Sequence, residues 1–278
     1  MAHLQLGKGV LNLDRPKVMG ILNVTPDSFS DGGKFFDRDQ AIRHAESMIA
    51  AGADILDIGG ESTRPGATDV SVDQELDRVI PVIEAVRAIS DIPLSVDTNK
   101  AAVMQAAINS GADMINDVRA LQNEGTMAVV AASNVGVCLM HMQGDPGTMQ
   151  RAPQYQDVVA EVIQFLRDRV AACRAAGISK ERLLIDPGVG FGKTLQHNLL
   201  LLKNLEQFSE LDVPLLVGMS RKKMIRELTD SDGENSAAGS IAAAVLAASK
   251  GARILRVHDV QPTVQALKIV AAMNGMDR

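Results

Sequence analysis

Eight short apolar runs, separated by helical stretches, constrain the fold of this chain more than any other feature. The runs are rich in β-branched and aliphatic residues, which favour strands. They lie at Val18–Val24, Ile55–Gly59, Leu94–Asp97, Met114–Val118, Val137–His141, Leu183–Asp186, Leu215–Met219 and Ile254–His258. The clearest helical segments between them are Asp39–Ala51, Asp73–Ile89, Lys100–Ser110, Tyr155–Ala176 and Ser236–Lys250. Regular alternation of strand and helix predicts an α/β fold with a parallel sheet.

Eight alternations predict a single (β/α)₈ TIM barrel that spans residues 1–278 as one domain. The alternative is a doubly wound open sheet, which gathers its site at one switch point. Here polar residues follow nearly every run, as expected when eight loops share one mouth. The alternating segments Leu4–Gly7 and Val10–Leu13 predict an N-terminal β-hairpin across the barrel floor.

Composition excludes several classes of function. The net charge is −6, lysine and arginine form no run, and only six Phe and one Tyr are aromatic, which argues against nucleic-acid binding. No apolar run approaches the ~18 residues of a membrane span. The N-terminus lacks the pattern of a signal peptide, so we expect a cytoplasmic protein. Cys138 and Cys173 match no disulfide or zinc spacing.

The polar residues that end the runs form two groups. The first group consists of two carboxylates and an amide, from Asp97, Asp186 and Asn116. Such hydrogen-bonding groups suit a heterocycle that displays N–H and C=O groups. The second group consists of basic side chains, which suit an anion. Its members are Arg64, Lys222, Arg256 and His258. Any one of these residues could instead cap a helix or satisfy a loop. As a set at the strand ends of a barrel, they predict a pocket for a heterocycle beside an anion.

Seven longer motifs, in order along the chain, resemble those of the dihydropteroate synthases. The first two run from Met19 to Gly33 and from Asp57 to Gly66. The others are Ser95–Thr98, Asn116–Asp117, Asp186–Lys193, Gly218–Lys222 and Arg256–Asp259. The match extends from about Val18 to Val260, nearly the whole chain. Gly188–Thr194 is not a phosphate-binding P-loop, because Pro187 occupies the position of its first glycine.

The resemblance implies a transferase of folate biosynthesis and a target of sulfonamides. Such an enzyme condenses 6-hydroxymethyl-7,8-dihydropterin diphosphate with p-aminobenzoate to give 7,8-dihydropteroate and diphosphate. The resemblance also implies a homodimer and Mg²⁺ as cofactor, with Asn23 as the protein ligand of the metal. A single amide suits Mg²⁺, because this ion keeps waters and takes phosphate oxygens from substrates.

The resemblance assigns roles residue by residue. Pterin binding falls to Asp97, Asn116, Asp186, Lys222, Met140 and Gly218, with Val118 and Leu216 as apolar surroundings. Diphosphate binding falls to Asn23, Thr63, Arg64, Arg256 and His258. The p-aminobenzoate pocket comprises Phe29, Pro65, Phe191 and Ser220. Catalysis falls to Asp97, Lys222 and Asp31. Family members often carry serine directly after Ser-Arg-Lys, so Lys223 leaves open how the p-aminobenzoate carboxylate is held.

Two other functions share part of this pattern. A methyltransferase that passes a methyl group from methyltetrahydrofolate to a corrinoid protein would keep the pterin carboxylates but would not need the diphosphate cations. A pterin carrier without catalysis would not need the loops at Asn23–Gly33 and Ser62–Gly66. We assign Asp54 and Asp57 to a buried polar layer below the site, and His141 either to the site or to neighbouring backbone.

Overall fold

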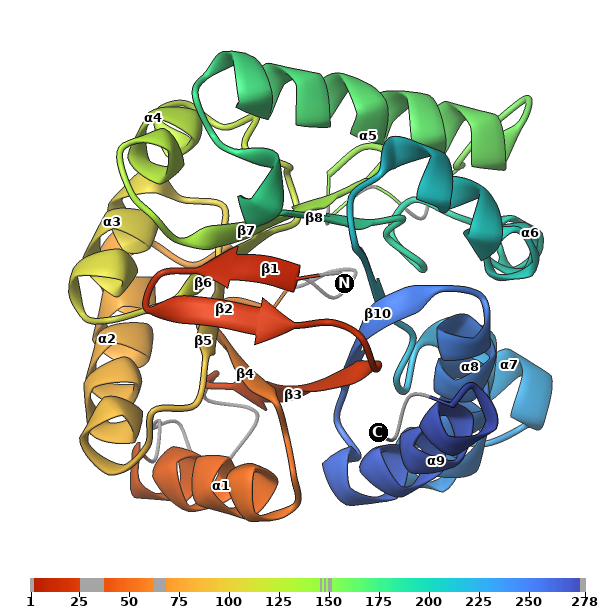
Figure 1. Cartoon of the computed structure of the whole chain (residues 1–278), viewed down its shortest axis with the longest axis horizontal. Coiled ribbons are helices and arrows are strands. Elements are labelled where there is room, and N and C mark those ends of the chain that lie inside the picture. The colour runs from red at the N-terminus through yellow and green to blue at the C-terminus, as the bar shows by residue number, and fades with distance from the viewer. Residues whose placement is uncertain are drawn as a thin grey trace.

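Eight parallel strands form a closed barrel in this computed structural model, which describes residues 3–25, 38–62, 69–145, 147, 149 and 152–275 (Figure 1). Their order around the barrel is β10-β3-β4-β5-β6-β7-β8-β9. The bounds are β3 (Lys17–Asn23), β4 (Ile55–Gly59), β5 (Leu94–Asp97), β6 (Met114–Asp117), β7 (Gly136–Met140), β8 (Leu183–Asp186), β9 (Leu215–Gly218) and β10 (Ala252–Val257). The (β/α)₈ barrel is therefore confirmed, and each predicted run overlaps one barrel strand.

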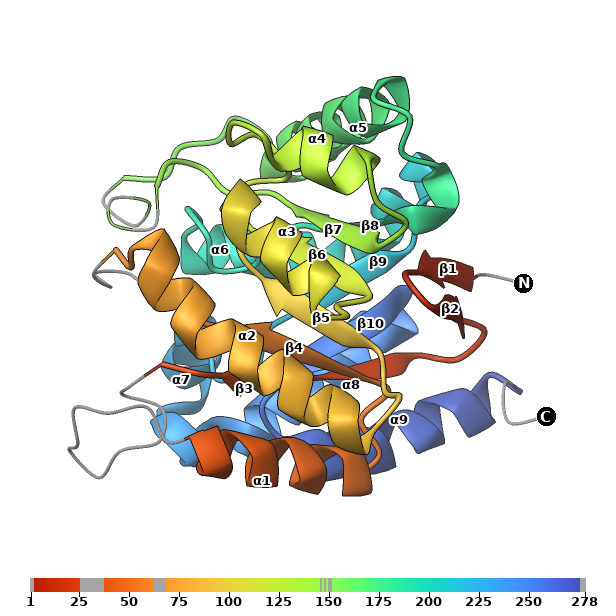
Figure 2. The ribbon, with the colours of Figure 1, turned by 90° about the vertical axis from the view of Figure 1, so that its left-hand side faces the viewer.

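Helices surround the barrel and cover the outer faces of its strands (Figures 1 and 2). They are α1 (Arg38–Ala50), α2 (Val72–Ile89), α3 (Ala101–Asn109), α4 (Thr126–Ala131), α5 (Val158–Ala175), α6 (Leu195–Lys203), α7 (Lys223–Thr229), α8 (Ala237–Ser249) and α9 (Val260–Met273). Shorter 3₁₀ turns are η2 (Lys180–Arg182), η3 (Leu205–Leu211) and η4 (Gly233–Ser236). Among the described helices, none combines the length and hydropathy that a membrane span needs.

The start of α5 differs from the prediction for a local reason. The sequence pattern placed it at Tyr155, but the side chain of Asp157 accepts hydrogen bonds from the N–H groups of Val159 and Ala160. An aspartate in this position caps a helix, because it satisfies N–H groups that have no partner inside the helix. The helix therefore begins at Val158.

Side chains alternate between the two faces of each strand. Outward residues such as Val18, Leu56 and Val96 pack against the helices in one large apolar cluster. Inward residues near the strand starts form a second cluster with the hairpin β1 (His3–Leu6) and β2 (Gly9–Asn12). Its members are Leu4, Leu6, Leu13, Met19, Ile55, Met114, Cys138, Leu184, Leu216 and Ile254. The hairpin lies across one end of the barrel (Figures 1 and 2), so the predicted floor is confirmed.

Polar residues fill the barrel interior directly above this apolar floor. Two positions beyond Ile55, Met114 and Ile254 on their strands stand Asp57, Asn116 and Arg256. Because side chains on a strand repeat every second residue, these three also point inward. The apolar floor therefore ends where the polar interior begins, and that interior opens at the C-terminal ends of the strands.

Candidate active site

Arg256 joins two carboxylates inside the mouth of the barrel. Its Nε lies 2.6 Å from Oδ2 of Asp57, and its Nη2 lies 2.9 Å from Oδ2 of Asp97. Asp57 is fully buried and also accepts a hydrogen bond of 3.1 Å from the amide of Asn116. Strands β4, β5, β6 and β10 thus bring one network together. Asp57 forms the buried polar layer that the sequence suggested.

Asp97 has the chemistry of a group that ionises near neutral pH. Burial raises the pKa of Asp97 to about 7, against the opposing charge of Arg256 and with a contribution from nearby carboxylates such as Asp57. Burial has this effect because it removes the water that would solvate the charged form. Perturbed carboxyl groups in a mouth of this kind are characteristic of active sites.

Lys222 and Asp186 lie on the opposite side of the mouth. Burial lowers the pKa of Lys222 to about 8, while the charge of Asp186 opposes the change. Burial raises the pKa of Asp186 in turn, against the charge of Lys222. The Lys222 ammonium donates to the Val189 carbonyl and lies 4.5 Å from the centre of the Phe191 ring. An ammonium over an aromatic ring is attracted by its electron-rich face.

Ser220 and His258 meet beside β10. The backbone N–H of His258 donates to Oγ of Ser220 over 3.1 Å, and Nδ1 of the imidazole lies 3.0 Å from the same oxygen. The turn that carries Ser220 is fixed by an ion pair of 2.6 Å between Arg221 and Asp259. Residues assigned by resemblance to p-aminobenzoate and to diphosphate are therefore in contact.

Asn23 ends β3 and faces the site across Gly59. A Cβ on Gly59 would lie 3.6 Å from Oδ1 of Asn23 and 3.7 Å from Cβ of Asp97. Asn23 and Asp97 therefore flank Gly59 on the two strands that pair with β4. Within the described ranges, no cluster of three or more His, Cys, Asp or Glu residues could hold a metal ion. A lone amide fits Mg²⁺ held chiefly by substrate oxygens.

The remaining predicted residues have different outcomes. Met140 is buried beside Asp186 in the register of β7 and β8, and Gly218 pairs with Arg256. Val118 is buried after β6, whereas Leu216 lies one layer lower, in the floor cluster. Phe29, Asp31, Thr63, Arg64 and Pro65 lie outside the described residues.

Lys223 and His141, which the sequence left open, each have a defined place. The Lys223 side chain is 76% exposed and forms an ion pair with Glu227 of the same helix over 3.3 Å. In this structure Lys223 therefore points to solvent. The Nδ1 atom of His141 lies 2.9 Å from Nζ of the buried Lys193, so the ring binds a side chain and not only backbone.

A partly buried ion cluster beside the site was not predicted. Nζ of Lys100 lies 2.6 Å from Glu61 and 2.5 Å from the fully buried Glu75. Glu61 also accepts a hydrogen bond of 2.9 Å from the N–H of Val70. Glu61 and Val70, which precede and follow residues 63–68 in the sequence, are therefore hydrogen-bonded to each other. The sequence carried a signal for this cluster, because Glu75 lies on the same helical stripe as the buried Val79 and Val82.

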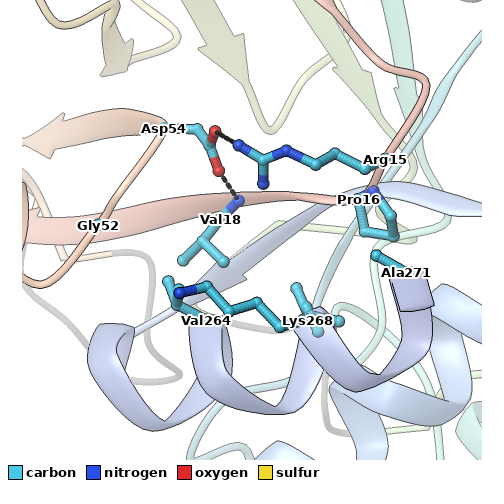
Figure 3. Close-up of a pocket in the computed structure, with 9 residues that line it drawn as sticks. Arg15, Pro16, Val18, Gly52, Asp54, Val264, Lys268 and Ala271 are labelled. Carbon is cyan, nitrogen blue, oxygen red and sulfur yellow. Dashed lines mark hydrogen bonds and ion pairs between the residues drawn. The ribbon is translucent and has the colours of Figure 1, made fainter. Parts of the chain in front are cut away.

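A hollow at the barrel floor is not the site. It has a volume of about 290 Å³ and lies between α9 and the starts of β3 and β4 (Figure 3). Its carboxylate, Asp54, binds Arg15 over 3.2 Å and Lys17 over 3.3 Å, so this carboxylate is already paired. Asp54 thus belongs to the floor and not to the polar layer of Asp57. Barrel enzymes bind substrates at the opposite, C-terminal ends of the strands.

Comparison with known proteins gives one consistent result. The model of the family described as pterin binding enzyme matches residues 19–258. The chain is 53% identical to the dihydropteroate synthase of Escherichia coli (strain K12) over 262 residues, which are 94% of this chain and 93% of that protein.

Two solved structures extend the likeness. The dihydropteroate synthase of Yersinia pestis, solved with a sulfonamide drug, has a TM-score of 0.94 and 52% identity, covering 98% of this chain and 99% of that one. The enzyme from Xanthomonas albilineans in complex with 7,8-dihydropteroate has a TM-score of 0.90 and 51% identity, covering 98% of each chain.

Proposed function

Because the chain belongs to the family of pterin-binding enzymes, we propose that it catalyses the dihydropteroate synthase reaction. It condenses 6-hydroxymethyl-7,8-dihydropterin diphosphate with p-aminobenzoate and releases dihydropteroate and diphosphate. The observation that carries this proposal is the direct contact between Arg256 and Asp97. Arg256 is a cation suited to the departing diphosphate, and Asp97 is a carboxylate suited to the pterin. Their contact places the two binding regions next to each other.

The pterin is held by groups on both sides of the mouth. Asn116 and Asp186 present an amide and a carboxyl group to the N–H and C=O edge of the ring, and Lys222 donates to an acceptor on it. Asp97 has a pKa of about 7, so a large fraction of it is ionised at neutral pH. Its negative charge stabilises the positive charge that develops on the pterin as the leaving group departs.

The bond that breaks joins the pterin CH₂ group to diphosphate, and the bond that forms joins the same carbon to the amine nitrogen. Arg256 and His258 offer N–H donors to the departing diphosphate. Mg²⁺, when bound, supplies positive charge to this leaving group, and Asn23 is the described residue that would hold it. The amine is neutral at pH 7 and loses one proton on attack, so it needs no strong base.

The amine enters beside Phe191 and Ser220. Lys222 lies over the Phe191 ring, so the same side chain borders the pterin pocket and the p-aminobenzoate pocket. The family motifs add five predicted roles to this proposal. They assign diphosphate binding to Thr63 and Arg64, p-aminobenzoate binding to Phe29 and Pro65, and catalysis to Asp31.

The chain acts as a homodimer in this proposal. Large apolar side chains are exposed on α8 and α9: Leu246 is 51% exposed, Ile269 73% and Met273 71%. A contiguous apolar patch on adjacent helices would mark an interface between copies of the chain. Light scattering of the purified protein should give the mass of two chains, and the mass of one would exclude this interface. A cytoplasmic location remains a prediction.

The experiment that tests the function measures diphosphate release. Purified protein is mixed with the pterin diphosphate and Mg²⁺, with and without p-aminobenzoate. We expect release that depends on p-aminobenzoate and is blocked by a sulfonamide. A methyltransferase would instead transfer a methyl group from methyltetrahydrofolate to a corrinoid protein, and a carrier would bind the pterin without turnover. Either result would exclude the synthase reaction.

A further inference from the structure

Lys193 is a buried lysine at the end of the loop between β8 and α6. It is 2% exposed, and no carboxylate within the described part of the chain forms a salt bridge with it. Its Nζ lies 3.0 Å from the carbonyl oxygens of both Gly188 and Phe191, and 2.9 Å from Nδ1 of His141. A buried amine without hydrogen bonds would be very costly, so these acceptors determine where the side chain can lie.

The acceptors around Lys193 match its donors. Burial, together with the charge of Lys193, lowers the pKa of His141 to about 3, so the ring is neutral and Nδ1 can accept. Burial also lowers the pKa of Lys193 itself. An ammonium has three N–H bonds and a neutral amine has two, so either form can donate to both loop carbonyls. Lys193 therefore holds both loop carbonyls whatever its charge, and the ammonium form, with its third N–H, also ties the loop to the end of β7 through Nδ1 of His141.

The same loop holds Lys222 on its other side. The Val189 carbonyl accepts from Nζ of Lys222, and the Phe191 ring lies below that ammonium. A Cβ on Gly190 would lie 3.1 Å from Cδ of Lys222, so the loop backbone approaches this side chain closely. The carbonyls of Gly188 and Val189 thus point to different lysines. Rotation of either of these two consecutive peptide units would turn its carbonyl away from its lysine.

We propose that Lys193 is a positioning residue that acts through Lys222. By holding the carbonyls of Gly188 and Phe191, it fixes the Val189 carbonyl and the Phe191 ring, and these hold Lys222 in the mouth of the barrel. The inference rests on the proposed function only for the identity of what Lys222 binds, the pterin. Lys193 does not itself touch the substrate.

A double-mutant cycle tests this coupling. Calorimetry measures the affinity of 6-hydroxymethyl-7,8-dihydropterin, which lacks diphosphate, for the wild type, Lys193→Met, Lys222→Ala and the double variant. We expect Lys193→Met to weaken binding at least tenfold in the wild-type background and less than twofold in the Lys222→Ala background. Equal losses in both backgrounds, or no loss in either, would overturn the proposal. Lys203→Met, at an exposed position on α6, is the matched control and should bind as the wild type does.

The conformation of the loop in the variants can be followed with a probe that contacts the loop. The chain has one tyrosine and no tryptophan, and the Tyr155 hydroxyl donates to the Gly192 carbonyl over 2.9 Å. Tyrosine fluorescence should therefore change in Lys193→Met and stay unchanged in Lys203→Met. Unchanged emission in Lys193→Met would count against the proposal.

If Lys193→Met does not fold, Lys193→Gln takes its place, because its amide keeps two N–H donors. In a folded Lys193→Gln variant we expect an affinity loss smaller than that of Lys222→Ala and again absent in the Lys222→Ala background. Additive losses would refute the coupling. These measurements need binding and no turnover. A wild type that binds the pterin without forming product would therefore refute the proposed function and leave the role of Lys193 standing.

Discussion

Asp97→Asn should remove most of the activity of the enzyme and at the same time stabilise its fold. The folded-state pKa of Asp97 is about 7, whereas its ordinary value is 3.8. A carboxyl group with a raised pKa binds its proton more tightly in the folded state than in the unfolded state. Its contribution to the free energy of unfolding is therefore lost as pH rises from about 4 through about 7. Asparagine is neutral at every pH, so it avoids this loss.

The size of the effect follows from the two pKa values. Their difference of about 3 corresponds to about 4 kcal/mol when Asp97 is fully ionised, since each pKa unit is about 1.4 kcal/mol. At pH 5 only about one pKa unit of this has been lost, or on the order of 1–2 kcal/mol. Arg256 keeps Asp57 as a partner in the variant, over 2.6 Å, so the substitution leaves no unpaired buried cation. The gain in stability should thus be on the order of 2–4 kcal/mol at pH 8 and roughly half that or less at pH 5.

Urea unfolding of both proteins at pH 5 and pH 8 measures this directly. Turnover in Asp97→Asn should fall by about one to two decades, the value of one charge-assisted contact. Asp54→Asn is the control, because this carboxylate binds Arg15 and Lys17 at the floor; its loss should lower stability and leave turnover intact. If Asp97→Asn were less stable than the wild type at pH 8, or if its gain were the same at both pH values, the burial argument would be wrong.

Three further predictions concern the same site. Lys222→Ala should lose about one to two decades in pterin affinity while staying folded, because it removes a charge-assisted contact; calorimetry that shows full affinity would exclude Lys222 from the pterin pocket. The profile of kcat/KM against pH should rise through about 7 as Asp97 ionises and fall through about 8 as Lys222 loses its proton, and a flat profile from pH 6 to 9 would contradict both assignments. Chelation of divalent metal should stop turnover but hardly change the affinity of a pterin without diphosphate; tight metal binding to the free protein would show that Asn23 has other protein partners at the metal.

The local pattern of apolar runs in the sequence was enough to predict the fold of this chain. Parallel strands covered on both faces appear as short apolar runs, and β4, β5 and β8 begin and end where the runs Ile55–Gly59, Leu94–Asp97 and Leu183–Asp186 do. The boundary of α5 needed the capping geometry of Asp157, which the apolar periodicity does not report. Pattern therefore predicts that an element exists better than it predicts where that element ends.

The partners inside the site did not follow from pattern. Arg256 was assigned to an anion, yet it bridges Asp57 and Asp97, which lie 199 and 159 residues away. Such pairings depend on which interior positions face each other across the closed barrel. Lys193 is a similar case, because its acceptors include two backbone carbonyls whose direction only the folded loop defines. Residue type and strand position predicted which polar side chains stand at the C-terminal ends of the strands, and the three-dimensional structure determines their contacts.

The most direct test of the central claim identifies the product. Purified protein is incubated with 6-hydroxymethyl-7,8-dihydropterin diphosphate, isotopically labelled p-aminobenzoate and Mg²⁺, and the mixture is analysed by mass spectrometry. The account predicts labelled 7,8-dihydropteroate together with an equal amount of diphosphate, and a loss of at least tenfold in both with Asp97→Asn. Wild-type protein that binds the pterin diphosphate but forms no labelled dihydropteroate would contradict it.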